Sequence, residues 1–338
     1  MFKVYLVGAG QIGSRHLQAL KKVAMPLDIT VIDPSKQSLA TAKNRYREIH
    51  INKKIHTISF SQEIPKNPRG STSGKTWVDL VIVATTSNVR AGIIKNLLKN
   101  NRVKYFLLEK LLFDKKRDYH AIEKLFSKLK IKAWVNCPLR LRPLYKKIKE
   151  NFNYSSNLSF RLSGSRWGLA TNTIHCFDFL VYLLGNANFK INTAFLDKKT
   201  IPSKRDGFLE LNGTLYVNFE SSLKSHTRGE FTSYSSGNMP RVVEIFSEKQ
   251  RYIFPDQEKD GEAWISRAEN NWEWEKVPFH IPLISETTAW IVEDILKRGR
   301  CLLPTYTESA QIHLAFLEPL RKFLNKNSEK KYDYYPFT

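Results

Sequence analysis

The chain has 338 residues, more than the ~250–300 at which a single hydrophobic core usually stops growing, so we expect two domains. Hydrophobic residues make up 42% and charged residues 25%, as in ordinary soluble globular proteins. No apolar run reaches the ~18 residues of a membrane span, and the N-terminal segment has the pattern of a strand, not of a signal peptide.

The net charge of +22 raises the question of a nucleic-acid partner. The basic residues are dispersed over expected helix surfaces and form no recognition motif, so nucleic-acid binding is not favoured. An acidic substrate, or a generally lysine-rich proteome, explains the charge equally well. The three cysteines are widely separated, which is typical of reduced thiols, and we expect a cytoplasmic protein.

Residues 1–137 alternate short apolar strands with helical patterns, which predicts a Rossmann domain with a doubly wound parallel sheet. The expected strands are Lys3–Val7, Ile29–Ile32, Thr57–Phe60, Leu80–Ala84, Tyr105–Leu108 and Lys132–Asn136. The expected helices are Ile12–Val23, Lys36–Tyr46, Asn88–Leu98 and Asp118–Leu129.

The segment GAGQIG, residues 8–13, follows the first strand and matches the dinucleotide-binding pattern GxGxxG. Gly8 permits the tight turn, Gly10 lets the backbone approach a pyrophosphate, and Gly13 allows close packing of helix and sheet. The second expected strand ends at Asp33, an acid suited to the adenosine ribose hydroxyls and unsuited to a 2′-phosphate. The sequence therefore favours NAD over NADP, although Lys36 lies nearby.

The segment RGSTSGKT, residues 69–76, superficially resembles a phosphate-binding P-loop. Its two glycines enclose three residues instead of four, and no strand leads into it. We expect an exposed connection there.

A charged pair, Glu109 and Lys110, interrupts the apolar run of KYFLLEKLLFDKK. Ligands of open parallel sheets lie beyond the carboxyl ends of the strands, where this pair is expected. A lysine there can polarise a carbonyl or hold a reacting hydroxyl. A surface lysine that merely follows a strand is an equal alternative.

Residues 138–338 have a different pattern, which predicts an α+β domain with a mainly antiparallel open sheet. We expect a helix after Pro143, a strand near Ser159–Leu162, and hairpins at Asn212-Gly213 and within residues 242–254. A helix is expected over Glu286–Arg298, with Ser285 as its cap and Gly299 as its stop. The last helix is expected to start at a Thr305–Glu308 capping box, to kink or end at Pro319, and to pack back on the first domain.

The segment GLATNTIHCFDFLVYLLG, residues 168–185, contains a helix expected over Ile174–Leu184. His175 and Asp178 share one face, with Asn172 one turn earlier. A packed histidine bonded to Asp178 is the alternative to a catalytic base. No metal-ligand spacing surrounds these residues, so no metal is expected.

Together these motifs resemble the glucose–fructose oxidoreductase/inositol dehydrogenase (Gfo/Idh/MocA) family. The resemblance spans nearly the whole chain and rests on GAGQIGSRH, VDLVIVATTSNVRAGIIKNLL, LLEKLL, CPLRLRP and TNTIHCFDFLVYLLG in that order. It implies hydride transfer between a nicotinamide and a carbon of a sugar, amino sugar or nucleotide-activated sugar. It also implies homo-oligomers built through the C-terminal sheet.

Carried over by position, the resemblance implies that Lys110 and His175 are catalytic. Lys110 would hold and polarise the oxygen whose proton His175 exchanges. The implied cofactor contacts are Gly8, Gly10, Gln11, Ile12, Gly13, Asp33, Thr85, Thr86 and Glu109. The candidate substrate contacts are Arg166, Trp167, Asn172 and Asp178.

The sequence departs from the family pattern at four positions. Leu111 replaces the proline after the lysine, Thr86 the proline of Ala-Thr-Pro, Arg90 a nearby histidine, and Thr171 the aspartate four residues before the histidine. The pattern of these departures resembles that of family members that serve surface-polysaccharide sugar pathways. They also leave open an NAD-binding regulatory or scaffold protein with impaired catalysis.

Overall fold

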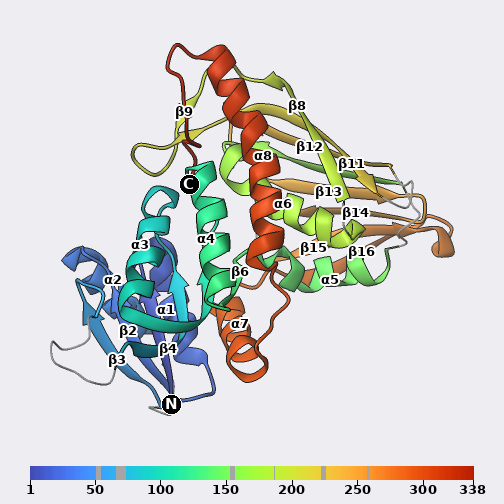
Figure 1. The fold of residues 1–338 in the computed structure, drawn as a ribbon. Coiled ribbons are helices and arrows are strands. Elements are labelled where there is room, and N and C mark those ends of the chain that lie inside the picture. Colours follow the sequence, from blue (N-terminus) through green and yellow to red (C-terminus); the bar gives the residue numbers. More distant parts are fainter. Residues whose placement is uncertain (51–54, 66–73, 153–156, 186, 222–225, 257–258) are drawn as a thin grey trace. The chain divides into compact units, whose positions relative to one another are not determined.

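The computed structural model describes residues 1–338 except 51–54, 66–73, 153–156, 186, 222–225 and 257–258 (Figure 1). The chain forms two compact units. Unit 1 contains Met1–Asn136 and Pro282–Ala310, and unit 2 contains Cys137–Ile281 and Gln311–Thr338. Most of the segment 69–76 lies outside the described residues.

Unit 1 is built on a six-stranded parallel sheet with the strand order β3-β2-β1-β4-β5-β6. The central strands are apolar on both sides because helices cover both faces of such a sheet. The Rossmann prediction is confirmed, since every expected strand and helix of residues 1–137 is present within a few residues. The strands are β1 Phe2–Val7, β2 Leu27–Ile32, β3 Thr57–Ser61, β4 Thr76–Val83, β5 Asn101–Leu108 and β6 Lys132–Val135. The helices are α1 Gln11–Lys22, α2 Lys36–Glu48, α3 Ser87–Asn100 and α4 Lys116–Lys128.

A later helix, α7 (Ile284–Arg298), also belongs to unit 1 and packs on α1. The expected boundary after residue 137 did not anticipate this return of residues 282–310. Gly299, with φ +63°, ends α7 as predicted. The predicted cap at Ser285 was wrong: the helix starts at Ile284, two residues earlier than expected, with Leu283 in the cap position. The Glu286 carboxylate accepts the Leu283 backbone N–H at 2.7 Å.

Unit 2 contains an eight-stranded mixed sheet with the order β16-β15-β14-β13-β7-β12-β11-β8, in which only the β7–β12 pair is parallel among the described strands. The predicted mainly antiparallel sheet is confirmed. Its strands are β7 Leu158–Ser165, β8 Ala187–Leu196, β11 Gly213–Ser221, β12 His226–Tyr234, β13 Val242–Ser247, β14 Gln250–Pro255, β15 Asp260–Arg267 and β16 Trp274–His280.

The helices of unit 2 pack on one face of that sheet (Figure 1). Phe177 contacts Phe219 of β11 and Phe231 of β12, with ring centroids 5.6 and 5.5 Å apart. On the opposite face, charged side chains such as Arg161 and Glu230 pair across strands. The helices are η1 Pro138–Leu141, α5 Pro143–Glu150 and α6 Leu169–Leu184, and η2 covers Ala268–Asn270.

The helix α8 (Tyr306–Asn327) begins in unit 1 and continues in unit 2. The Thr305–Glu308 capping box is confirmed: the carboxylate of Glu308 accepts the Thr305 N–H at 2.8 Å, and Thr305 Oγ1 accepts the Glu308 N–H at 3.4 Å. The helix continues through Pro319 to Asn327. Of the two effects predicted for this proline, a kink or an end, the end does not occur. A proline in a helix interior removes one backbone hydrogen bond and can kink the helix without ending it.

The hairpin predicted at Asn212-Gly213 was wrong, whereas the hairpin of β13 and β14 within 242–254 is confirmed. Strand β10 (Leu209–Glu210) pairs with β9 (Ile201–Pro202) in a separate two-stranded sheet. Strand β11, which follows at once, pairs with β8 and β12 instead. The turn signal reflected only the positive φ of Gly213, +93°, which leads the chain from one sheet into the other.

Two glycines of the first turn allow a matched test of packing. A Cβ at Gly13 would lie 1.7 Å from the Gly8 carbonyl oxygen, whereas a Cβ at Gly10 would meet no described atom within 4 Å. We expect Gly13→Ala to lower the free energy of unfolding by about 1–3 kcal/mol or more, because the helix must move away from the strand. Gly10→Ala should cost at most about 1 kcal/mol. Urea unfolding of both variants checks this, and equal losses would contradict it.

Candidate functional site

The GAGQIG turn joins β1 to α1 and brings the backbone close to a helix N-terminus. Gly8 has a φ of +94°, and its N–H donates to the Ile32 carbonyl at 2.8 Å. Gly10 is exposed and caps α1, and among the described residues no side chain caps the first amides of that helix. The first turn also carries no acidic residue. An exposed helix N-terminus with open backbone is well suited to a phosphate group.

Arg45 of α2 adds a positive charge beside this turn. Its guanidinium donates to the Gln11 side chain at 2.7 Å and to Ser14 Oγ at 2.6 Å. These bonds orient Gln11, which the sequence suggested as a cofactor contact, and hold α2 against the start of α1. Ile12 is half-buried in the same turn.

Asp33 lies at the end of β2, next to the turn. Its carboxylate accepts the Ala9 N–H at 2.7 Å and the Ser35 N–H at 2.8 Å. A carboxylate has about four lone-pair sites, so two backbone bonds leave capacity for ribose hydroxyls. The negative charge is therefore held in place at the strand end.

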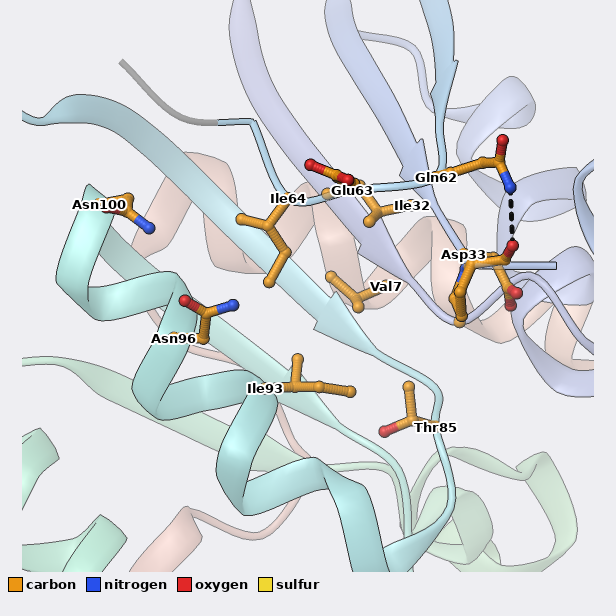
Figure 2. Close-up of a pocket in the computed structure, with 12 residues that line it drawn as sticks. Val7, Ile32, Asp33, Gln62, Glu63, Ile64, Thr85, Ile93, Asn96 and Asn100 are labelled. Atoms are coloured by element: carbon orange, nitrogen blue, oxygen red, sulfur yellow. Dashed lines mark hydrogen bonds between the residues drawn. The ribbon is translucent and has the colours of Figure 1, made fainter. Parts of the chain in front are cut away.

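A cavity of about 430 Å³ opens beside Asp33, at the carboxyl ends of β1, β2 and β4 (Figure 2). Apolar side chains of Val7, Ile64 and Ile93 line it, and Thr85 lies at one end. Thr85 Oγ1 is buried and has no hydrogen-bond partner among the described residues. A buried hydroxyl without a partner costs free energy, so this atom is suited to a polar group of a bound ligand. The adjoining Thr86 caps α3, and its hydroxyl donates to Asn88 Oδ1 at 2.7 Å.

These features together fit a dinucleotide. The open backbone at Gly10 and the amides of α1 suit the pyrophosphate, Asp33 suits a ribose, and the apolar cavity suits an aromatic base. Among the described residues, no group of three or more His, Cys, Asp or Glu side chains is arranged to hold a metal ion.

The charged pair Glu109–Lys110 lies directly after β5, at the edge predicted from the sequence. Glu109 is only 8% exposed and binds protein groups: its Oε1 accepts from Asn136 at 2.6 Å and lies 2.9 Å from His16 Nε2. His16 Nδ1 in turn lies 2.7 Å from Thr288 Oγ1 of α7. Glu109, expected as a cofactor contact, thus has a structural role that connects α1, β5, β6 and α7.

Burial by itself would raise the pKa of Glu109. The hydrogen bond and charge of His16, the Asn136 hydrogen bond and the charge of Lys110 outweigh it and hold the pKa below its ordinary value of 4.5. The ionised carboxylate is therefore the form that the folded state stabilises.

Arg90, which stands where the family pattern has a histidine, organises the loop that carries Lys110. The residue is fully buried. Its guanidinium donates to the carbonyls of Glu109 at 2.6 Å and Leu112 at 2.8 Å, and also to those of Leu111 and Thr85. The Lys110–Leu111 peptide bond is cis, although no proline follows the lysine. A charged residue within the buried stripe of α3 was the signal that the sequence offered for this role.

In unit 2, α6 starts at Leu169, five residues before the predicted start, and includes Asn172 and His175. His175 is half-buried on this helix. The Asn172 amide donates to the Trp167 carbonyl at 2.6 Å. The structure describes Lys110 and His175 in different units.

The other candidate substrate contacts of unit 2 differ in exposure. Asp178 is 1% exposed and forms a bidentate ion pair with Arg140, at 2.7 and 2.8 Å. The Trp167 ring is buried and donates to the Thr232 carbonyl at 2.7 Å. These contacts give Asp178 and Trp167 structural roles. Arg166 is exposed, and its Nε donates to the Ser235 carbonyl at 2.9 Å.

No known family profile and no curated protein matches the sequence. Solved structures with a similar fold include levoglucosan dehydrogenase in complex with NADH, with a TM-score of 0.67 and 16% identity over 97% of this chain and 98% of that chain. UDP-N-acetylglucosamine 3-dehydrogenase GnnA from Acidithiobacillus ferrooxidans has a TM-score of 0.65 and 13% identity over 94% and 95%. Biliverdin reductase from Synechocystis sp. PCC 6803, in complex with biliverdin and NADP+, has a TM-score of 0.65 and 12% identity over 97% and 99%.

The first two of these neighbours are Gfo/Idh/MocA-type dehydrogenases, so the resemblance seen in the sequence is confirmed at the level of the fold. A fold supports many activities, and the activity must be argued from the residues of this chain.

The buried carboxylate of Glu109 predicts a pH-dependent stability. Because its folded pKa is lowered, the stabilisation is present above the ordinary value of 4.5 and is lost as the pH falls through the folded pKa. We expect Glu109→Gln to lower the free energy of unfolding at pH 7 by about 1–3 kcal/mol, and the melting temperature with it. The difference from wild type should shrink below about pH 4.5. Thermal unfolding from pH 3 to 8 measures it, with the exposed Glu63→Gln as a control. A pH-independent difference would contradict the role.

Because Asp178 and Arg140 form a buried ion pair, removing one partner is predicted to cause a large loss of stability. We expect Asp178→Ala to lower the free energy of unfolding by about 3–5 kcal/mol, because the Arg140 charge stays buried. Glu230→Ala removes one of the two acidic partners of the half-exposed Arg161 and should cost about 0–1 kcal/mol. Urea unfolding compares the two variants. A stable Asp178→Ala protein would contradict the structural role and favour a substrate contact.

Proposed function

We propose that the chain is an oxidoreductase of the Gfo/Idh/MocA family that uses NAD to transfer a hydride to or from a CH–OH carbon of a sugar. The observation that carries the proposal is the β1–α1 turn, where Gly10 is open, Gly13 is closely packed and Asp33 stands at the end of β2. Two structural neighbours are named as a levoglucosan dehydrogenase with NADH and a UDP-N-acetylglucosamine 3-dehydrogenase, which supports a sugar substrate. The biliverdin reductase shows that the fold alone does not decide this class.

The first turn and Asp33 would hold the dinucleotide. The amides of Gln11, Ile12 and Gly13 begin α1 and are suited to the pyrophosphate. Asp33 would accept hydrogen bonds from the adenosine ribose and repel a 2′-phosphate, which favours NAD over NADP. Thr85 Oγ1 would gain a partner from the bound cofactor.

Lys110 and His175 would handle the reacting oxygen. The cofactor, when bound, supplies or accepts the hydride. His175 would take the hydroxyl proton when the alcohol is oxidised and return it when the carbonyl is reduced, so that the proton and hydride together balance the reaction. Lys110, fixed by the carbonyl bonds of Arg90 to its loop, would hold and polarise the same oxygen.

An amino sugar or nucleotide-activated sugar of a surface-polysaccharide pathway is the proposed substrate. The exposed guanidinium of Arg166 lies shortly before α6 and is suited to an anionic group. We also propose a cytoplasmic homo-oligomer that uses the unit 2 sheet, whose strands carry exposed aromatic side chains: Phe195, Tyr216 and Trp264. In the described part of the chain, no helix has the length and apolarity to cross a membrane.

Asp33 provides the test of the cofactor site. We expect NADH to bind more tightly than NADPH, and Asp33→Ala to abolish this preference, because the charge that excludes a 2′-phosphate is removed. Fluorescence titration and melting temperature measure both, since a ligand at ~100 times its Kd adds about 2.7 kcal/mol of stability. Turnover is then screened with UDP-N-acetylglucosamine, levoglucosan and L-sorbose. Asp28→Ala, at the start of β2, is the matched control.

The outcomes separate the alternatives. Absence of NADH and NADPH binding would overturn the proposal. Tight NADH binding without turnover of any sugar, together with Lys110→Ala and His175→Ala variants that bind NADH normally, would favour the regulatory or scaffold protein.

A further inference from the structure

The first half of α6 presents a narrow polar stripe between buried side chains. Thr171, Asn172 and His175 are half-buried and, with Gly168 before the helix, lie at the three- and four-residue spacing of one helix face. The neighbouring side chains in these turns are buried: Leu169, Ala170, Thr173, Ile174 and Cys176. All three side chains of the stripe can form hydrogen bonds.

A carboxylate from a distant part of the chain lies against this stripe. Glu210 of β10 is 7% exposed, and Thr171 Oγ1 donates a hydrogen bond to its Oε1. Its second oxygen faces the start of α6, where a Cβ on Gly168 would lie 3.4 Å from Oε2 and 2.9 Å from Asn172 Nδ2. Gly168, with φ +80°, thus leaves space in front of the carboxylate and the amide.

The position of Glu210 is fixed by the C-terminal residues of unit 2. The Leu209 N–H donates to the Pro336 carbonyl at 2.8 Å, and β10 pairs with Ile201 and Pro202. The flanking Tyr335 and Phe337 are 2% and 0% exposed. The carboxylate is therefore held by packed backbone and not by a long flexible segment.

We propose that Glu210 is a substrate-binding residue that accepts a hydrogen bond from a hydroxyl of the sugar, with Asn172 and His175 on the same stripe. A carboxylate accepts several hydrogen bonds, and Thr171 supplies one of them. Charge-assisted bonds to hydroxyls are short and strong, and a buried carboxylate rejects an anionic group at that point. The inference rests on the proposed function, since it names one contact of the same substrate.

The experiment compares Glu210→Gln with wild type, using UDP-N-acetylglucosamine, levoglucosan and L-sorbose in turn. Gln has the same shape and can still accept from Thr171, but it lacks the charge. For the sugar that is turned over, we expect kcat/KM to fall about 10- to 100-fold in Glu210→Gln and about 3- to 10-fold in Thr171→Val. Glu244→Gln, a half-buried acid of β13 that pairs with Arg161, should change kcat/KM less than about twofold. The Kd for NADH should stay the same in all of them.

A deoxy form of the sugar identifies the contact. If Glu210 binds one hydroxyl, the sugar that lacks it should be used equally poorly by wild type and Glu210→Gln, so the ratio of their kcat/KM values falls to about one. A Glu210→Gln protein with wild-type kcat/KM would overturn the inference. If Glu210→Gln weakens NADH binding and lowers the melting temperature in parallel with activity, the role of Glu210 is purely structural, and the inference is also overturned.

Failure of the proposed function is recognised separately. If NADH does not bind wild type, the cofactor proposal fails. The melting temperature with each sugar alone then still tests whether Glu210 contacts a sugar hydroxyl. A sugar-induced rise in wild type that disappears in Glu210→Gln supports the contact. If none of the sugars raises the melting temperature of wild type, the contact with a sugar hydroxyl is rejected.

Discussion

A buried polar network at the carboxyl end of β5 is the constraint on which unit 1 depends. Glu109 is held by His16 of α1 and Asn136 after β6, while His16 reaches Thr288 of α7. Each of these groups is buried, so each would be costly if its partner were lost. The network therefore connects three distant parts of the sequence to the end of β5. It fixes the start of the loop that carries Lys110.

Arg90 extends this network to the backbone. Its bonds to the carbonyls of Glu109 and Leu112 hold the loop after β5, and its bond to Thr85 holds the loop after β4. Both loops carry candidate site residues. A single buried guanidinium, with its several donors in a fixed plane, can orient two loops at once where a smaller side chain would orient one.

In unit 2 the corresponding role belongs to the packing of α6. The ion pair of Arg140 and Asp178 and the aromatic contacts of Phe177 fix the buried sides of this helix. The remaining stripe is polar because it is the part that the core does not cover. Glu210, which contacts this stripe through Thr171, lies on β10, and β10 belongs to a different sheet from β11.

Much of the fold and part of the site could be predicted from the sequence. The alternation of apolar strands and amphipathic helices indicated the parallel sheet, because residues close in sequence set that periodicity. The GxGxxG turn was found because its glycines lie within residues 8–13, and Asp33 because it directly follows the second apolar strand. The hairpin at Asn212-Gly213 was wrong, since a glycine with positive φ suits a turn between sheets as well as one within a sheet.

The sequence by itself determined the local chemistry of this protein: the first turn, the charged pair after β5, the capping box before α8 and the helix that carries His175. Only the tertiary structure decided which polar groups pair with one another inside the protein. Glu109 and Asp178 bind His16 and Arg140, and Glu210 contacts Thr171, 39 residues away. Such contacts join residues far apart in the chain, and neither spacing nor periodicity records them, because they arise when buried polar groups must find partners.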